Sequence, residues 1–251
     1  MVSGKPKLNW FVILPAVVAG AAGPIGYRLL APKAQESQAL QALEKNPRAK
    51  AAFETVMKPI MDEPAFKQRL EAGIGREPAL EMAVVATGGP AAALSQQLAA
   101  QGALRLPAKE YMALQAVKLE LARKSPKVCA GMWSGGITEE ELVGTIEKLS
   151  DQDLRRYFEL GGQALRLELQ TNQPLPRFER AAVLQGIEEI AGALPSAEQQ
   201  ALLQTVEAGV NVPPEAGCKA MTHLLVGALR MPPERGARFI AGLTNPALLD
   251  G

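Results

Sequence analysis

The feature that most constrains this chain is an uncharged apolar run near its N-terminus. Residues 8–27, which read LNWFVILPAVVAGAAGPIGY, carry no charged side chain over 20 positions. Because a helix rises about 1.5 Å per residue, this run would span about 30 Å as a helix, which matches the hydrocarbon core of a bilayer. The sequence therefore predicts that residues 1–31 form a membrane anchor or a signal segment, and that residues 8–27 contact the membrane.

The residues in and around this run fit two alternatives. Lys5 and Lys7 precede it, and Trp10 and Tyr27 lie toward its ends, where aromatic side chains gather in transmembrane helices. A basic start, a short apolar core and the A-x-A site in residues 19–21 are also typical of a secretory signal peptide. We expect a protein that stays anchored and faces the periplasm or extracellular space, or one that is secreted after signal cleavage.

Two other interpretations of the same run stay open. A helix buried in a protein core would have to contain Pro15 and Pro24. An anchored protein whose body faces the cytoplasm would also need the run, and its cysteines would then be reduced.

The remainder of the chain is predicted to be all-α. Residues 32–46 are polar apart from alanine and leucine, and we expect a spacer or a short first helix there. Residues 47–251 are expected to form a compact multi-helix bundle. No stretch alternates apolar and polar residues over the length of a strand, and no Asn-Gly or Asp-Gly turn joins two such runs, so no sheet is expected.

Helix starts are marked repeatedly along residues 47–251. Proline recurs where apolar residues with helical spacing begin, and its fixed φ suits the first helical turn. Thr138, Ser150 and Ser196 each precede an acidic or amide side chain by three residues, which is the spacing of a capping box. We expect helices to begin near these three positions, and the glycines at 135 and 136 to end the helix before the first of them.

One internal similarity suggests a duplicated helical hairpin. Residues 106–114 and residues 194–202 share the pattern L-P-x-x-E-x-x-A-L, and each is followed, 23 or 24 residues after its first leucine, by a C-x-x-M tetrad. Such matches arise easily in a chain rich in alanine and leucine, and three copies or more are typical of a true repeat array. The duplication is one interpretation of the pattern.

The interpretation of the two cysteines, Cys129 and Cys218, depends on whether the N-terminal run exports the body of the chain. If the body is exported, they meet oxidising conditions and are predicted to form a disulfide that closes a loop of about 90 residues. If it is not exported, two buried thiols would fill the core as small apolar side chains. A catalytic thiol has little support, because His223 follows Cys218 by five residues and faces a different side of a helix.

Composition and motifs argue against several other classes of function. The chain has 27 Lys+Arg against 26 Asp+Glu and no basic cluster, so no nucleic-acid partner is expected. No phosphate-binding glycine motif occurs, and a zinc site would need ligands beyond one histidine and two cysteines. We therefore expect no cofactor and no metal site.

Trp133 marks the one loop that could bind a partner. It lies in CAGMWSGGITEEE, where an indole precedes a glycine turn and an acidic helix start. The alternative is an indole that anchors this turn against the core.

The sequence favours a non-enzymatic role, in which the helical body contacts a protein partner or serves a structural purpose. The competing hypothesis is an extracytoplasmic all-α hydrolase that uses glutamate or aspartate chemistry. In class, an exported all-α domain resembles lytic transglycosylases, whose general acid is the glutamate of an E-S motif. Glu36-Ser37 is the only such pair here, and it lies in the spacer rather than in a helical core.

Overall fold

The structure is a computed structural model that describes residues 38–73 and 90–250. The apolar run at residues 8–27 and Glu36 lie outside these ranges. Within the described ranges, no helix combines the length and the apolar character needed to cross a membrane.

The prediction of an all-α fold is confirmed for the described part of the chain, which contains twelve α-helices. Their bounds, in chain order, are α1 Gln38–Glu44, α2 Pro47–Met61, α3 Pro64–Gly73, α5 Pro90–Ala103, α6 Ala108–Lys124, α7 Pro126–Ser134, α8 Glu139–Ile146, α9 Asp151–Leu169, α10 Arg180–Gly192, α11 Ser196–Ala208, α12 Pro214–Arg230 and α13 Pro233–Thr244.

The expectation of no sheet needs a small correction. Two short strands, β1 (Phe178–Glu179) and β2 (Leu249–Asp250), pair in parallel, and the 3-10 turn η2 (Pro246–Leu248) leads into the second of them. Two residues are too few to show an alternating pattern, and the partners are distant in sequence. This pair therefore leaves no local signal in the sequence.

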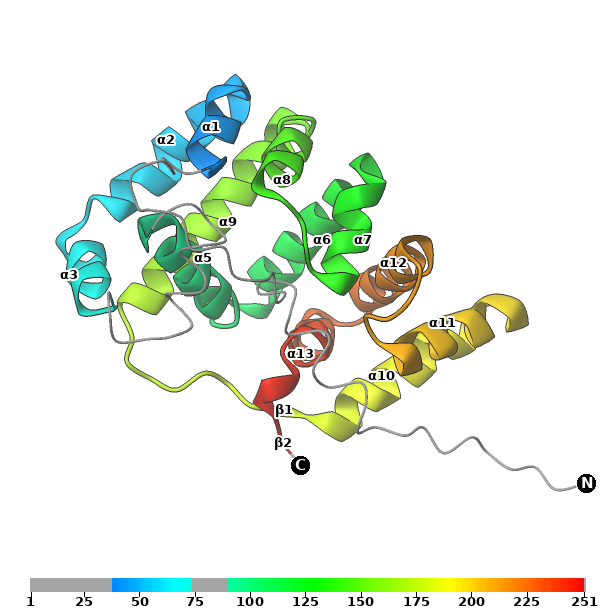
Figure 1. Cartoon of the computed structure of the whole chain (residues 1–251). Coiled ribbons are helices and arrows are strands. Elements are labelled where there is room, and N and C mark those ends of the chain that lie inside the picture. Colours follow the sequence, from blue (N-terminus) through cyan, green and yellow to red (C-terminus); the bar gives the residue numbers. More distant parts are fainter. Residues whose placement is uncertain (1–37, 74–89, 251) are drawn as a thin grey trace, which may run out of the picture.

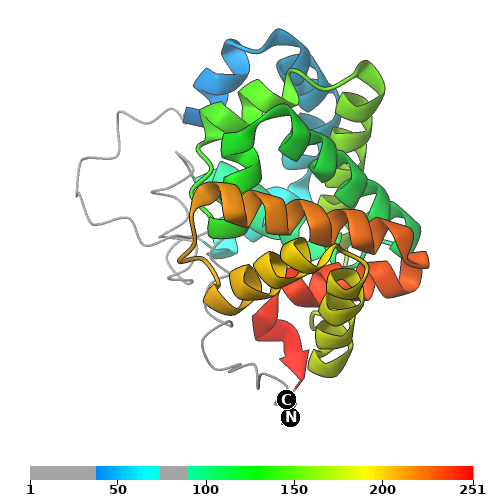
Figure 2. The ribbon, with the colours of Figure 1, turned by 90° about the vertical axis from the view of Figure 1, so that its right-hand side faces the viewer.

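The helices are ordered along the molecule much as they are along the chain. Helices α1–α3 lie at one end, α5–α9 fill the middle, and α10–α13 form the other end (Figure 1). Helix α12 packs against α7 on one side and against α11 and α13 on the other, and it stretches across that end in the turned view (Figure 2). The strands β1 and β2 lie at the edge of this end.

Helix α6 supplies side chains to two of the hydrophobic clusters. Met112 and Leu114 pack with α10–α13, whereas Val117 and Leu121 pack with α1, α2, α8 and α9. Its residues 111–115 are all buried, so the first part of this helix is enclosed on every side. The two ends of the molecule therefore share one central helix.

The expected helix starts are confirmed, with one difference in chemistry. Thr138 and Glu141 form a complete capping box at α8, and the Ser150 hydroxyl accepts a hydrogen bond of 3.1 Å from the Asp153 amide at α9. Helix α11 does begin at Ser196, but its cap is Pro195 and no side chain caps it. Helix α7 ends where expected, at the glycines of positive φ that follow Ser134.

Helix α1 falls within the segment expected to be a spacer or a short helix. It packs against α8, with Leu43 buried in the same cluster as the start of α2. The corner between α8 and α9 is tied to α2 by reciprocal capping. The Glu147 carboxylate accepts from the amides of Arg48 and Ala49, and the Arg48 guanidinium donates to the carbonyls of Glu147 and Leu149.

The two copies of the L-P-x-x-E-x-x-A-L pattern have the same local role. Each begins a helix, α6 or α11, directly after its proline, and the next helix carries a cysteine. The helices that follow differ, because α7 has 9 residues and α12 has 17. Duplication of a whole hairpin stays a prediction.

The contact between α5 and α9 depends on a glycine. A Cβ atom placed on Gly102 would lie 1.8 Å from the carbonyl oxygen of Ala164, which no side-chain rotation can relieve. Gly144, in the interior of α8, has no atom within 4 Å of the corresponding position. Gly102 is therefore needed for close helix packing, whereas Gly144 is not.

We predict opposite effects of alanine at these two positions. Gly102→Ala should lower the free energy of unfolding by about 2–3 kcal/mol or more, because the backbones of α5 and α9 must move apart. Gly144→Ala should raise it by up to about 0.5–1 kcal/mol, because alanine favours the helix. Urea unfolding followed by circular dichroism measures both, and equal stabilities for the two variants would contradict this packing.

Candidate functional site

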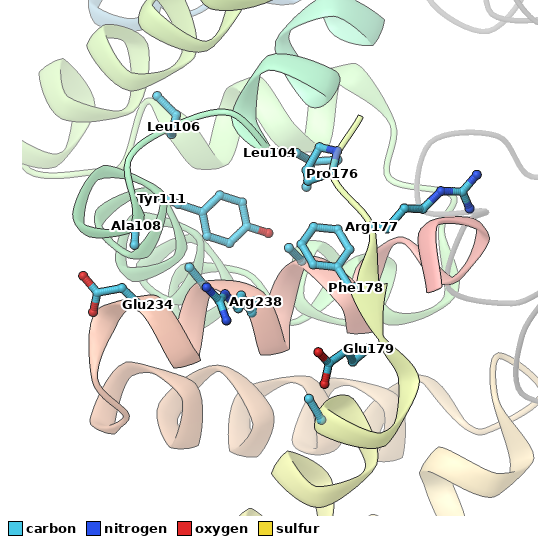
Figure 3. A pocket seen from close by; sticks show the side chains of 13 residues that line it. Leu104, Leu106, Ala108, Tyr111, Pro176, Arg177, Phe178, Glu179, Glu234 and Arg238 are labelled. Carbon is cyan, nitrogen blue, oxygen red and sulfur yellow. The ribbon is translucent and has the colours of Figure 1, made fainter. Parts of the chain in front are cut away.

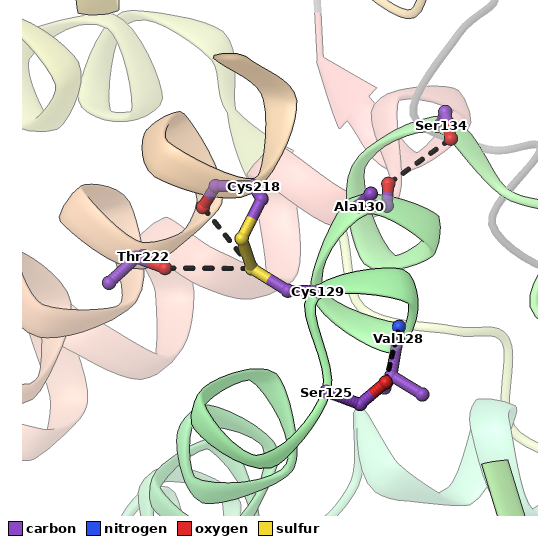
Figure 4. The surroundings of a disulfide bond; sticks show 7 residues. All are labelled: Ser125, Val128, Cys129, Ala130, Ser134, Cys218 and Thr222. Atoms are coloured by element: carbon purple, nitrogen blue, oxygen red, sulfur yellow. Dashed lines mark hydrogen bonds between the residues drawn. A yellow bond between two sulfur atoms is a disulfide. The ribbon is translucent and has the colours of Figure 1, made fainter. Parts of the chain in front are cut away.

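The structure joins the two cysteines that the sequence singled out. Cys129 of α7 and Cys218 of α12 form a disulfide with a Cα–Cα distance of 5.0 Å across a sequence separation of 89 (Figure 4). Cys129 is 1% exposed, and its sulfur lies 3.7 Å from the Thr222 hydroxyl. In the chain-entropy model, closing a loop of this length contributes on the order of 4 kcal/mol to stability.

Local structure places Cys129 at this contact. Helix α6 ends at Lys124, and the hydroxyl of the next residue, Ser125, accepts a hydrogen bond from the Val128 amide and so caps the start of α7 at Pro126 (Figure 4). Cys129 follows one turn later, on the face that packs against α12. The disulfide thus covalently links two helices that already pack together.

Trp133 lies in the core rather than on the loop surface. The side chain is 4% exposed, and its Nε1 donates a hydrogen bond of 2.7 Å to the carbonyl of Gly209 at the end of α11. The indole also packs directly against Gly217 of α12. These contacts match an anchoring indole, so a partner of this loop would meet the exposed Ser134 and Gly136 instead.

His223 does not lie in a nucleophile or metal arrangement. Its Nε2 is 3.9 Å from the Glu198 carboxylate, and the sulfur of Cys218 is bonded to Cys129. Across residues 38–73 and 90–250, no group of three or more metal-binding side chains comes together.

Sequence reasoning missed a cavity of about 400 Å³ at the end of the molecule formed by α10–α13. Its apolar lining comes from the corner before α6, from α6 itself, from the extended segment with β1, from the start of α10, and from α13. Leu106, Tyr111, Phe178, Ala182 and Ala241 represent these five segments, and the first three are labelled in Figure 3.

A buried ion pair holds the extended segment that leads to this cavity. The Arg105 Nε donates to the Glu168 carboxylate at 2.5 Å, with both side chains largely buried. The same guanidinium donates to the carbonyls of Gln173 and Pro174. One arginine in the corner before α6 therefore binds both the end of α9 and the chain that follows it.

The residues that follow this extended segment are held in place by the pairing of β1 with β2. Phe178 and Glu179 align with Leu249 and Asp250 in β2, and the Arg177 guanidinium donates to the carbonyl of Ala247 at 3.2 Å. This wall of the cavity is thus attached at both ends, and Arg177 points away from the cavity interior (Figure 3).

Besides Arg177, three charged side chains line the cavity, and they do not pair with one another. Glu179 of β1, Glu234 at the start of α13 and Arg238 one turn later are all exposed. No ion pair or hydrogen bond joins any of these side chains to another described residue. In Figure 3 the Arg238 and Glu179 side chains and the Tyr111 hydroxyl are turned toward the interior, whereas the Glu234 carboxylate is turned outward.

Tyr111 is the buried polar group of this cavity. Burial raises the pKa of its phenol well above the ordinary value of 10.0, and the Thr244 side chain offsets only part of that effect. The hydroxyl is therefore neutral at physiological pH and is able both to donate and to accept a hydrogen bond.

Comparisons of this chain with protein-family models, with curated proteins and with solved structures found no match.

The raised pKa of Tyr111 predicts a loss of stability at alkaline pH. The folded state holds the phenol proton more tightly than the unfolded chain, so this stabilisation is present below about pH 10 and is lost as the pH rises toward the folded-state pKa. Urea unfolding at pH 8 and pH 10.5 should show a larger loss in the wild type than in Tyr111→Phe. Tyr157 is present in both proteins and cancels, and equal losses would contradict the assignment.

Proposed function

We propose that this chain is an exported or membrane-anchored helical domain that acts by binding a protein partner. The Cys129–Cys218 disulfide is the observation that carries the proposal. Disulfides persist in the periplasm and outside the cell, and they are rare where thiol reductants are abundant. The apolar run at residues 8–27 supplies the means of export or anchoring.

The arrangement of reactive side chains supports binding rather than catalysis. Neither sulfur is free to act as a nucleophile, and His223 has no thiol or hydroxyl partner in the described ranges. Ser134 ends α7 and Gly136 lies in the short turn before α8, while the cavity is lined from α6, α13 and the paired strand β1. Backbone that is already attached to helices or a paired strand suits recognition, because less conformational entropy is lost when a partner binds.

A hydrolase is the second candidate function, and one observation favours it. Glu179 and Glu234 line the same cavity, as a pair of carboxylates would in acid–base chemistry. Both side chains are exposed, and Glu234 is turned away from the interior, so their surroundings do not set one apart as an acid and the other as a base. Hydrolytic activity lost in both Glu179→Gln and Glu234→Gln would favour this candidate.

The proposal is tested in cells with the full-length chain. We expect a C-terminal reporter that is active only after export to be active, and we expect deletion of residues 8–27 to abolish its activity. A reporter that is active only in the cytoplasm should give the opposite pattern. Activity of the cytoplasmic reporter on the full-length chain would contradict export.

Partner binding needs a second measurement on the same chain. A photo-reactive residue at exposed Ser134 should form one adduct with another protein in intact cells, and the same residue at exposed Arg155 of α9 should not. An adduct of equal yield at both positions, or at neither, would contradict a specific partner at this loop.

A further inference from the structure

Two side chains of opposite charge line the cavity beside α13 without forming an ion pair. Their separation limits the kinds of ligand that the cavity could bind. Arg238 and Glu179 line the same space from two different elements, yet no nitrogen–oxygen pair between them lies within 4.0 Å. Exposed side chains of opposite charge that are free to meet gain little by pairing. The unpaired state therefore leaves a guanidinium and a carboxylate available to a ligand.

The fold, rather than a flexible loop, sets the positions from which these charges extend. Glu179 lies in β1, which is paired to β2 and follows the segment bound by Arg105. Arg238 lies in the second turn of α13, which packs against α6, α10 and α12. Because the backbone that carries both charges is already fixed, only the side chains lose entropy when a ligand binds.

The lining between the charges is mostly apolar. Phe178 is 9% exposed and Leu106 is 7% exposed, and Ala237 and Ala241 form the α13 side of the space. The neutral Tyr111 hydroxyl is turned toward the interior (Figure 3). An apolar cavity with a few convergent polar groups is typical of a small-molecule site, and about 400 Å³ lies within the usual range of volumes.

We propose that this cavity binds a small zwitterion with an apolar side chain, either a free α-amino acid or a short peptide. The Arg238 guanidinium binds the ligand carboxylate, since guanidinium and carboxylate form parallel hydrogen bonds. Glu179 accepts hydrogen bonds from the ligand ammonium group, and the apolar side chain lies against Phe178. This proposal does not depend on export or on a protein partner.

Calorimetric titration of the full-length chain tests the proposal with defined probes. L-phenylalanine and the dipeptide Gly-Phe carry both charges, 3-phenylpropionate lacks the ammonium group, and 2-phenylethylamine lacks the carboxylate. We expect at least one zwitterion to bind about tenfold or more tightly than either single-charge analogue. The tighter of phenylalanine and Gly-Phe identifies the free amino acid or the peptide as the source.

Substitutions of lining residues test whether the zwitterion binds in this cavity. Arg238→Gln and Glu179→Gln should each weaken binding of the zwitterion about tenfold or more, and both should fold because these side chains are exposed and unpaired among the described residues. Arg155→Gln, a matched change of an exposed arginine on α9, should leave the affinity unchanged.

Three outcomes would overturn the proposal. They are no binding of either zwitterion, binding of 3-phenylpropionate as tight as that of the tighter zwitterion, and undiminished affinity for that zwitterion in Arg238→Gln. The second would indicate a simple anion site.

Discussion

Burial of α6 is the constraint on which the rest of the structure depends. The helix packs with α10–α13 through Met112 and Leu114, and with the helices of the opposite end through Val117 and Leu121. Its start forms one wall of the cavity, and its end passes at Ser125 into the helix that carries Cys129. Because one helix serves both ends, displacement of α6 would disturb the cavity and the disulfide contact together.

Two further attachments keep the C-terminal helices in place around α6. The disulfide joins α7 to α12, and Trp133 of α7 is hydrogen-bonded to the end of α11. On the opposite side, Arg105 is paired with Glu168 and holds the segment that leads to β1. A buried ion pair adds little net stability by itself, since desolvation opposes the attraction, but losing one partner strands a buried charge. Its main consequence here is to fix the chain that carries Phe178 and Glu179.

Features with local causes could be predicted from the sequence, and features made by distant segments could not. The capping residues Thr138 and Ser150 act on amides three positions away, so their helices were predicted correctly. The cysteines could be paired because there are only two. The cavity uses side chains from five segments between residues 104 and 241, and the pairing of Phe178 with Leu249 leaves no periodic signal. Local sequence patterns therefore predicted neither the cavity nor the strand pair.

Tyr111 shows how far residue type alone can lead. The sequence indicated no role for Tyr111, because its place in the cavity depends on α13 and on the extended segment with β1. Trp133 had two interpretations from the sequence, an accessible loop or an indole anchored against the core, and the fold placed the indole against Gly217. In both cases the tertiary neighbours, which are absent from the local sequence, decide whether an aromatic side chain is exposed.

The central claim is that the folded domain works where disulfides persist. Its most direct measurement is the redox state of Cys129 and Cys218 in intact cells that produce the full-length chain. A membrane-permeant alkylating reagent is added before lysis, and labelling is then completed on the denatured protein. We predict that neither cysteine is labelled until a reductant is added. Two labelled cysteines without reductant would contradict it.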